Sequence, residues 1–202
     1  MTLPPASRRA TCAACLRAQS ACICRWIRPV RAECALLVLQ HPLEVANAKN
    51  SARLLHLSVQ DSVLAVGEAF DAAQLDTLLH AGGRTPVLLY PASPGEPVAT
   101  DMPPAARLRL VVLDATWRKS RKMLHLNPVL QRLPRLALRD MPASSYRIRK
   151  AHAPDQLSTL EASAHALGQV EGDAVRLAAL FEAFEGFVEQ QAACVPRLKS
   201  PE

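Results

Sequence analysis

The stretch "LRLVVLDATWRKSRKMLHLN", residues 108–127, indicates the class of fold. Its first part is an unbroken apolar run up to Leu113, which is typical of a strand buried on both faces of a parallel sheet. The remainder, from Thr116 onward, predicts a helix that ends at Asn127 and Pro128. A buried strand that leads at once into a helix is typical of α/β proteins.

The same alternation of strand and helix continues on both sides of this stretch. Ser158 and Glu161 have the spacing of a capping box at the start of one later helix. The sequence therefore predicts an α/β fold with a mostly parallel sheet. Strands are predicted at 35–40, 62–67, 86–91 and 135–139, helices at 48–59, 71–83, 157–170 and 173–191, and loops at 92–106 and 140–156.

The length of the chain allows one sizeable core and a small appended module. It has 202 residues, of which 50% are hydrophobic. We expect a small knuckle with a flexible start at residues 1–34, a main domain at 35–192 and a tail at 193–202.

The charge balance favours polyanionic partners. Twenty-four Lys and Arg against 18 Asp and Glu give a formal net charge of +6 and an isoelectric point near 9.3. The sequence has no run of about 18 apolar residues, so no membrane span is expected. Its start, "MTLPPASRRATCAAC", lacks an apolar signal core. We therefore expect a cytoplasmic protein, in which grouped cysteines are metal ligands more often than disulfides.

Four of the six cysteines fall close together near the N-terminus, with the spacing C-x2-C-x6-C-x-C. Two close pairs joined by a short loop can surround one tetrahedral Zn²⁺, and four thiolates would leave the ion a structural role. Unrelated thiols, or a redox pair at the C-x-x-C, are the alternatives. Nearby arginines suggest contact with nucleic acid, or merely a solvated face. The predicted ligands are Cys12, Cys15, Cys22 and Cys24.

Asp114 is the first candidate for a functional residue, because ligands in open α/β sheets bind beyond the carboxyl ends of strands. The alternative is that its carboxylate merely caps the next helix. Trp117 is either a core residue or a flat wall for a base or cofactor ring. His41 and Glu44 follow the first strand in "HPLE" and form another possible pair, although no third metal ligand is evident.

The helix after Asp114 carries four cations, Arg118, Lys119, Arg121 and Lys122. Arg118, Arg121 and Lys122 share one face by their spacing, which suits a phosphate backbone brought to the strand end. A solvated charged face is the alternative reading.

Several ordered motifs together resemble one known family. "LDATW" with "RKSRKML", preceded by "HPLE" and "LLYP" and followed by "SSYRIRK" and "LSTLEA", resembles the DTW-domain proteins over residues 12–190. The four-cysteine spacing is similar to that of the bacterial type. The Asp-Thr-Trp signature is matched by Asp114, Thr116 and Trp117, with Ala115 where Gly is frequent. Ser51 stands after Asn50 where the family often has Thr.

The resemblance implies a SPOUT-like, knotted fold and a tRNA-uridine aminocarboxypropyltransferase activity. Such enzymes move the 3-amino-3-carboxypropyl group of S-adenosylmethionine (SAM) to N3 of a uridine, giving acp3U and methylthioadenosine. An RNA methyltransferase that uses SAM and a non-catalytic zinc-knuckle RNA-binding protein are the rival functions. The target tRNAs, the position of the uridine and the oligomeric state stay open.

By position, the resemblance also implies roles for particular residues. Asp114 would take the N3 proton or hold the uracil edge, Trp117 would stack on the base, and Arg147 or Arg149 would bind the carboxylate of the donor. The implied catalytic set is Asp114, Thr116 and Trp117. The implied SAM-binding set is Leu89, Tyr90, Pro91, Asp114, Leu136, Tyr146, Arg147, Arg149, Ser158, Thr159 and Glu161. The implied tRNA-binding set is His41, Glu44, Asn50, Ser51, Arg118, Lys119, Arg121, Lys122 and Lys150.

Overall fold

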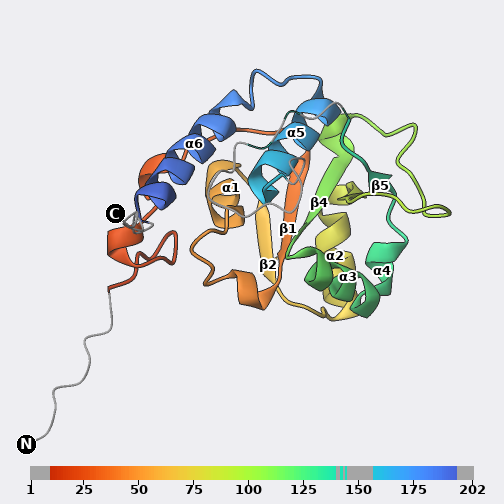
Figure 1. Ribbon diagram of the computed structural model, residues 1–202. Coiled ribbons are helices and arrows are strands. Elements are labelled where there is room, and N and C mark those ends of the chain that lie inside the picture. Colours follow the sequence, from red (N-terminus) through yellow and green to blue (C-terminus); the bar gives the residue numbers. More distant parts are fainter. Residues whose placement is uncertain (1–9, 140–141, 143, 145–156, 195–202) are drawn as a thin grey trace, which may run out of the picture.

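A five-stranded sheet in the order β2-β1-β4-β3-β5 lies at the centre of the computed structural model, which describes residues 10–139, 142, 144 and 157–194. Every pair of neighbouring strands is parallel, which confirms the predicted α/β class and parallel sheet (Figure 1). The strands are β1 (Ala35–Gln40), β2 (Val63–Val66), β3 (Thr85–Leu89), β4 (Leu108–Asp114) and β5 (Arg135–Leu136).

Helices cover both faces of the sheet because the central strands are apolar on both faces (Figure 1). In β1, Leu36 and Val38 join one core, whereas Leu37 and Leu39 join the other, as the period of two along a strand requires. The first core lies under α1 (Ala52–Ser58), α5 (Thr159–Glu171) and α6 (Ala178–Ala193). The second lies under α2 (Ala72–His80), α3 (Trp117–Leu126) and α4 (Pro128–Gln131).

Short 3-10 turns complete the described elements. They are η1 (Gln19–Ala21), η2 (Cys24–Trp26), η3 (Pro42–Glu44), η4 (Ala81–Gly83) and η5 (Ala105–Arg107). Within the residues that the structure describes, no helix has the length and apolar character needed to cross a bilayer.

Several predicted boundaries differ from those of the structure for local reasons. The helix predicted from residue 48 begins at Ala52, because the side chains of Asn47 and Asn50 accept hydrogen bonds from backbone N–H groups just ahead of them. The strand predicted at 135–139 has only two residues, since its partner β3 ends at Leu89 and Pro91 has no N–H to extend the ladder. The predicted capping box of Ser158 and Glu161 is confirmed.

The knotted, SPOUT-like topology stays a prediction. Most of the chain between β5 and α5 lies outside the described residues.

Candidate active site at the carboxyl edge of the sheet

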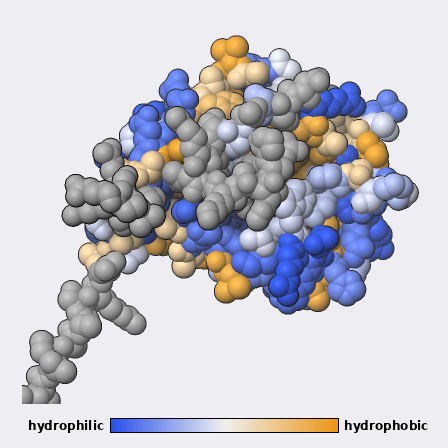
Figure 2. Space-filling view, in the orientation of Figure 1, coloured by the Kyte–Doolittle hydropathy of each residue, from blue (hydrophilic) through white to orange (hydrophobic). Residues whose placement is uncertain are grey.

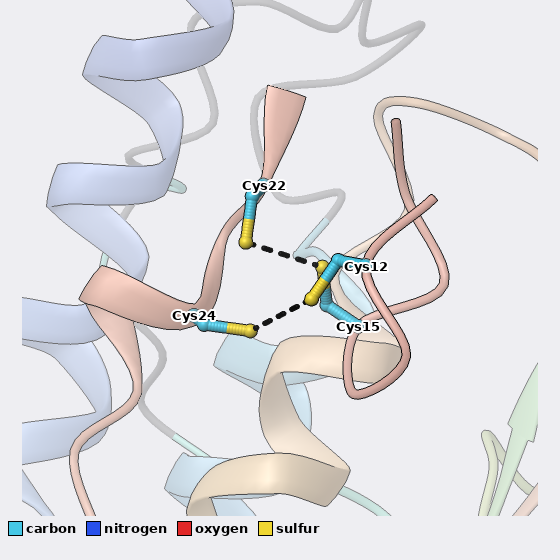
Figure 3. Close-up of side chains that lie close together, drawn as sticks. All are labelled: Cys12, Cys15, Cys22 and Cys24. Carbon is cyan, nitrogen blue, oxygen red and sulfur yellow. Dashed lines mark hydrogen bonds between the residues drawn. The ribbon is translucent and has the colours of Figure 1, made fainter. Parts of the chain in front are cut away.

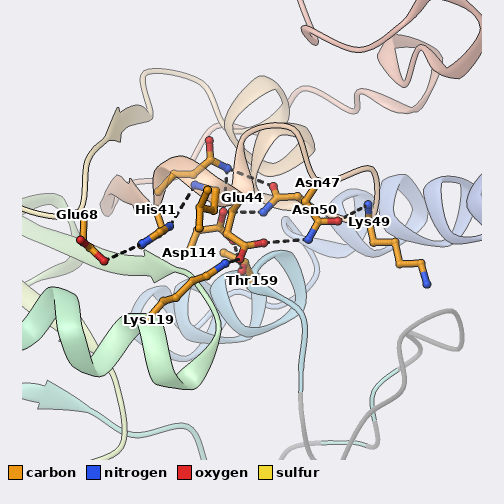
Figure 4. A network of polar contacts seen from close by, with 11 residues as sticks. His41, Glu44, Asn47, Lys49, Asn50, Glu68, Asp114, Lys119 and Thr159 are labelled. Carbon is orange, nitrogen blue, oxygen red and sulfur yellow. Dashed lines mark hydrogen bonds and ion pairs between the residues drawn. The ribbon is translucent and has the colours of Figure 1, made fainter.

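Asp114 is the centre of a buried polar cluster at the end of β4. Its side chain is almost fully buried and accepts three hydrogen bonds (Figure 4). Gln40, its register partner at the end of β1, donates to Oδ2 at 2.8 Å, and Asn50 donates to the same oxygen at 2.6 Å. Thr159, the first residue of α5, donates its hydroxyl proton to Oδ1 at 2.7 Å. The carboxylate therefore joins two strand ends, one turn and one helix start.

The interpretation of Asp114 as a helix cap is wrong. The N-cap residue of α3 is Thr116, and its side chain makes no capping hydrogen bond. The carboxylate of Asp114 instead faces β1, the turn before α1 and the start of α5. Its position needs an explanation other than helix capping.

Burial and hydrogen bonding act on Asp114 in opposite directions. Removal from water raises its pKa, while the hydrogen bonds from Gln40, Thr159 and Asn50 favour the charged form and limit the rise. The net result is a pKa above the usual range for an aspartate. A carboxylate with a raised pKa is a stronger base than a solvated one, which suits it to accept a proton.

The turn before α1 and the start of α5 are joined directly as well. Ser51 Oγ accepts a hydrogen bond from the backbone N–H of Leu160 at 3.2 Å, and the Ser158 and Glu161 side chains cap the same helix end. Asn50, Ser51 and Glu161 are all buried, so these polar side chains support the site from within.

His41 lies beside Asp114 and has a defined tautomer in this hydrogen-bond network. Its backbone N–H donates to the Asp114 carbonyl at 3.0 Å, and its Nδ1 accepts from the N–H of Leu43 at 3.1 Å. The proton of a neutral imidazole must then be on Nε2, which lies 3.0 Å from a carboxylate oxygen of Glu68 (Figure 4). His41 thus links the end of β1 to the segment after β2.

Glu44 and Lys119 form a second ion pair at this edge. Lys119 Nζ lies 2.8 Å from Glu44 Oε1, and Asn47 donates to Oε2 of the same carboxylate at 2.9 Å. Burial alone would raise the pKa of Glu44, but these two donors outweigh it and lower the pKa overall. The predicted pairing of His41 with Glu44 at a metal site is therefore replaced by two separate pairs, His41–Glu68 and Glu44–Lys119.

The basic helix α3 is partly neutralised. Lys119 is bound to Glu44, and Lys122 Nζ lies 2.8 Å from Glu68. Arg118 and Arg121 are exposed and have no carboxylate partner within residues 10–139, 142, 144 and 157–194. Figure 2 shows hydrophilic residues gathered over this part of the surface. Two of the four predicted phosphate ligands on α3 thus remain uncompensated cations.

An aromatic wall stands next to the carboxylate. Trp117 is 51% exposed, so it is not a core residue, and its ring meets that of Tyr90 edge-on with centroids 5.5 Å apart. Tyr90 OH lies 3.1 Å from Ser120 Oγ, which fixes the ring against α3. Behind it, the buried guanidinium of Arg135 lies 5.3 Å from the centroid of Tyr90. The exposed indole is available to a flat ligand.

Arg135 carries unused hydrogen-bonding capacity. Its Nη2 donates to Glu96 at 3.2 Å, whereas its buried Nε and Nη1 have no partner in the described structure. Buried N–H groups without partners are costly, so this arrangement fits a ligand or further group with acceptor atoms.

The other predicted residues fall into two groups. Leu89, Tyr90 and Leu136 lie at the adjoining ends of β3 and β5, where the Tyr90 N–H donates to the Leu136 carbonyl, and Pro91 and Thr116 are exposed nearby. The structure therefore brings most of the predicted SAM-binding residues to one edge. Tyr146, Arg147, Arg149 and Lys150 lie outside the described residues.

The four cysteines near the N-terminus lie together, as predicted (Figure 3). Their Sγ atoms are all within 4.8 Å of one another, and the Cys12–Cys24 and Cys15–Cys22 sulfur distances are 3.6 and 3.7 Å. Tetrahedral zinc with bonds of about 2.3 Å separates its sulfur ligands by about 3.8 Å, so the geometry fits. Backbone N–H groups lower the pKa of Cys12 to about 6, whereas burial and neighbouring thiols raise that of Cys24 to about 12. Four thiolates in this space require a cation.

Sequence reasoning missed some members of the site. Gln40 closes an otherwise apolar strand, and a polar residue at a strand end was the signal that could have found it. Glu68 and Arg135 had no comparable signal, because their partners come from distant parts of the chain.

Fold and site together define an α/β protein with a buried carboxylate and an exposed indole at the carboxyl edge of a parallel sheet, and with a four-cysteine cluster. The family model of the DTW domain matches residues 9–192. The chain belongs to the DTW-domain family. This finding agrees with the resemblance of the sequence motifs.

Named relatives are similar over most of the chain. "tRNA-uridine aminocarboxypropyltransferase 2" of Drosophila melanogaster is 29% identical over 175 residues, which cover 83% of this chain and 69% of the fly protein. The proteins of the same name from Macaca fascicularis and Mus musculus are each 27% identical over 85% and 82% of this chain. The chain spans only 60% and 58% of those two mammalian proteins. No solved structure matches.

Proposed function

We propose that the protein transfers the 3-amino-3-carboxypropyl group of SAM to N3 of a tRNA uridine. The single observation that carries the proposal is the buried Asp114 carboxylate, held by three hydrogen bonds beside the exposed Trp117 in a chain of the DTW family. The names of the relatives support the reaction class and the tRNA substrate. The protein would thus be an enzyme of tRNA modification.

The site has features that suit the donor. Leu89, Leu136 and the rings of Tyr90 and Trp117 offer apolar and aromatic surface for an adenine, and the unpaired nitrogens of Arg135 offer positive charge behind that wall. Arg147 and Arg149 stay our proposed ligands for the donor carboxylate. When bound, the donor would supply an electrophilic γ-carbon next to its sulfonium.

Asp114 would act on the acceptor. In our proposal it accepts the uridine N3 proton, the N3–Cγ bond forms, and the Cγ–S bond breaks with its electron pair left on sulfur, giving acp3U and methylthioadenosine. Gln40, Asn50 and Thr159 hold the carboxylate in place, so its two oxygens need not reorganise during the reaction. Trp117 would stack on the uracil.

The residues predicted to bind tRNA divide by their exposure. Arg118 and Arg121 are exposed and lack carboxylate partners among the described residues, so we propose them as phosphate ligands. Asn50 and Ser51 are buried and bonded within the site, so we propose for them a supporting role instead. His41 and Glu44 are also buried, and Lys119 and Lys122 would have to exchange a carboxylate for a phosphate.

One incubation tests the proposal. Purified protein is mixed with SAM and unmodified total tRNA, and nucleosides and small molecules are analysed by mass spectrometry. We expect acp3U with an equal amount of methylthioadenosine. A methylated nucleoside with S-adenosylhomocysteine would replace the proposal by a methyltransferase, and tRNA binding without either product would favour a non-catalytic binder.

The substitution Asp114→Asn tests the role of the carboxylate. The amide keeps the shape of the group, and the Thr159 hydroxyl can turn to accept from it, so the fold should persist. Transfer should fall at least about 100-fold, in the range of a lost general base, with SAM affinity nearly unchanged. Asp101→Asn, in the loop before β4, is the matched control and should transfer normally. Normal turnover by Asp114→Asn would refute the assignment.

A further inference from the structure

One side chain, Arg17, connects the cysteine-bearing segment to the candidate active site. Its guanidinium donates from Nη1 to the carbonyl oxygen of Ala48 and from Nη2 to that of Asn50, the latter at 2.6 Å. Asn50 in turn donates from its side-chain Nδ2 to Asp114 at 2.6 Å. A single residue is thus bonded through its backbone to the knuckle and through its side chain to the buried carboxylate.

The position of the Arg17 guanidinium is set from two further directions. Its carbon Cζ lies 5.1 Å from the centroid of the Phe187 ring, which is fully buried on α6. The backbone carbonyl of Arg17 accepts from the N–H of Cys12 at 2.8 Å, so Arg17 belongs to the same loop as the thiol cluster. The fold of the knuckle on α6 therefore places the guanidinium.

The turn that Arg17 binds has few other supports. Asn47, Ala48 and Lys49 are exposed, whereas Asn50, the next residue, is buried. An exposed connection is mobile unless its polar backbone groups are tied down. Two hydrogen bonds from a guanidinium are charge-assisted and directional, so they can hold such a turn in one conformation.

We propose that Arg17 is a positioning residue for the reaction, which fixes the 47–50 turn so that Asn50 stays aimed at Asp114. The proposal rests on the proposed function only in taking Asp114 as the reacting carboxylate. It gives the four-cysteine knuckle a place in the scaffold of the site, beyond any contact it makes with RNA.

The chain offers a matched control in Arg53. Arg53 on α1 donates from Nε and Nη2 to the carbonyl of Ala14 at 3.2 and 2.6 Å, so it also ties the knuckle to the main domain. Its printed contacts do not include the turn or Asn50. If Arg17 only docks the knuckle, Arg17→Ala and Arg53→Ala should behave alike.

The first readout does not require activity. The carboxyl ¹³C resonances of aspartates are titrated by NMR in the wild type and in Arg17→Ala, Arg17→Lys and Arg53→Ala. The charged groups near Asp114, Glu44 from η3 and Lys119 from α3, are the same in all four proteins, as is His41. Because the hydrogen bond from Asn50 lowers the pKa of Asp114, Arg17→Ala should raise that pKa and Arg53→Ala should not.

The lysine variant separates charge from geometry. Arg17→Lys keeps the positive charge but lacks the planar fork that reaches both carbonyls, so it should recover only part of the wild-type titration. A lysine variant identical to the wild type would assign the effect to charge alone and overturn the proposal. All four proteins should retain the same zinc content, measured by atomic spectroscopy.

The second readout is the transfer reaction. Arg17→Ala should lower kcat about ten-fold, with the acid limb of its pH profile moved upward, while KM for tRNA changes less than about two-fold. Equal titrations of Asp114 in Arg17→Ala and Arg53→Ala would overturn the positioning role. A shifted titration in a protein whose wild type forms no acp3U would support that role while refuting the proposed function.

Discussion

The Thr159 hydroxyl lies 2.7 Å from Asp114 Oδ1, so the first residue of α5 completes the hydrogen bonding of a carboxylate on β4. The same helix start is fastened on its other side, where the Leu160 N–H donates to Ser51 Oγ. The position of α5 and the ionisation of Asp114 are therefore coupled through one hydroxyl group.

Removal of that hydroxyl should weaken both the fold and the site. Thr159→Val keeps the shape of the side chain but leaves Oδ1 of a buried carboxylate without this donor. We expect a loss of about 1–2 kcal/mol in the free energy of unfolding and about ten-fold in transfer rate. Thr77→Val is the control, because that exposed hydroxyl only donates to the Ala73 carbonyl within α2. Urea denaturation of both variants checks the prediction, and equal stabilities would contradict it.

The two buried carboxylates at the site should affect stability with opposite dependence on pH. The pKa of Asp114 is raised by burial, so the stability that it contributes is present below the unfolded pKa of about 3.9 and is lost as pH rises through the folded pKa. The pKa of Glu44 is lowered, so its contribution is present above about 4.3 and is lost as pH falls through the folded pKa.

Denaturant unfolding of the wild type, Asp114→Asn and Glu44→Gln between pH 3 and 8 would measure these contributions. The stability of the wild type minus that of Asp114→Asn should fall as pH increases. The stability of the wild type minus that of Glu44→Gln should increase with pH. The same sign for both differences would show that one of the two environments is wrongly described.

The packing of the knuckle on α6 depends on the absence of a side chain at Gly186. A Cβ atom there would lie 2.1 Å from Cε3 of Trp26, so Gly186→Ala should cost about 1–3 kcal/mol through overpacking. At Gly168, in α5, the nearest atom to a new Cβ is 3.5 Å away. Gly168→Ala should be neutral or stabilise the helix by up to about 1 kcal/mol. Thermal unfolding of both variants distinguishes overpacking from a general effect of alanine.

Metal removal should act first on the cysteine cluster. We expect about one zinc ion per chain, released by a strong chelator together with loss of hydrogen-exchange protection in residues 10–34. Cys22→Ser should abolish stoichiometric binding. Cys194→Ser, at an exposed thiol outside the cluster, should bind zinc like the wild type. A protein that contains no zinc after expression in zinc-supplied medium would argue against a metal site.

The sheet and the cysteine cluster could be predicted because their signals are local. Unbroken apolar runs such as "ALLVLQ" mark buried strands, and four closely spaced cysteines mark a metal site whatever the rest of the chain does. Asp114 was found by the same kind of signal, a carboxylate directly after an apolar strand.

The partners of these residues could not be predicted, because they depend on where the chain returns. Nothing local in "NAKNS" shows that Asn50 is buried against Asp114, or that Lys119 and Lys122 are paired with Glu44 and Glu68. The assignment of His41 and Glu44 to one pair failed for this reason, since each found a partner from another element. The residues at the strand ends were predictable, but their charge state was not.

The wide sequence separations within the site have a consequence for folding. The donors to Asp114 come from residues 74, 64 and 45 positions away along the chain. Contacts between such distant residues form slowly and only once the intervening strands and helices are in place. During synthesis, the carboxylate of β4 must wait for α5 to emerge before its last donor arrives. The chemistry of this site is therefore a property of the finished fold, and a nascent chain that lacks α5 should be inert.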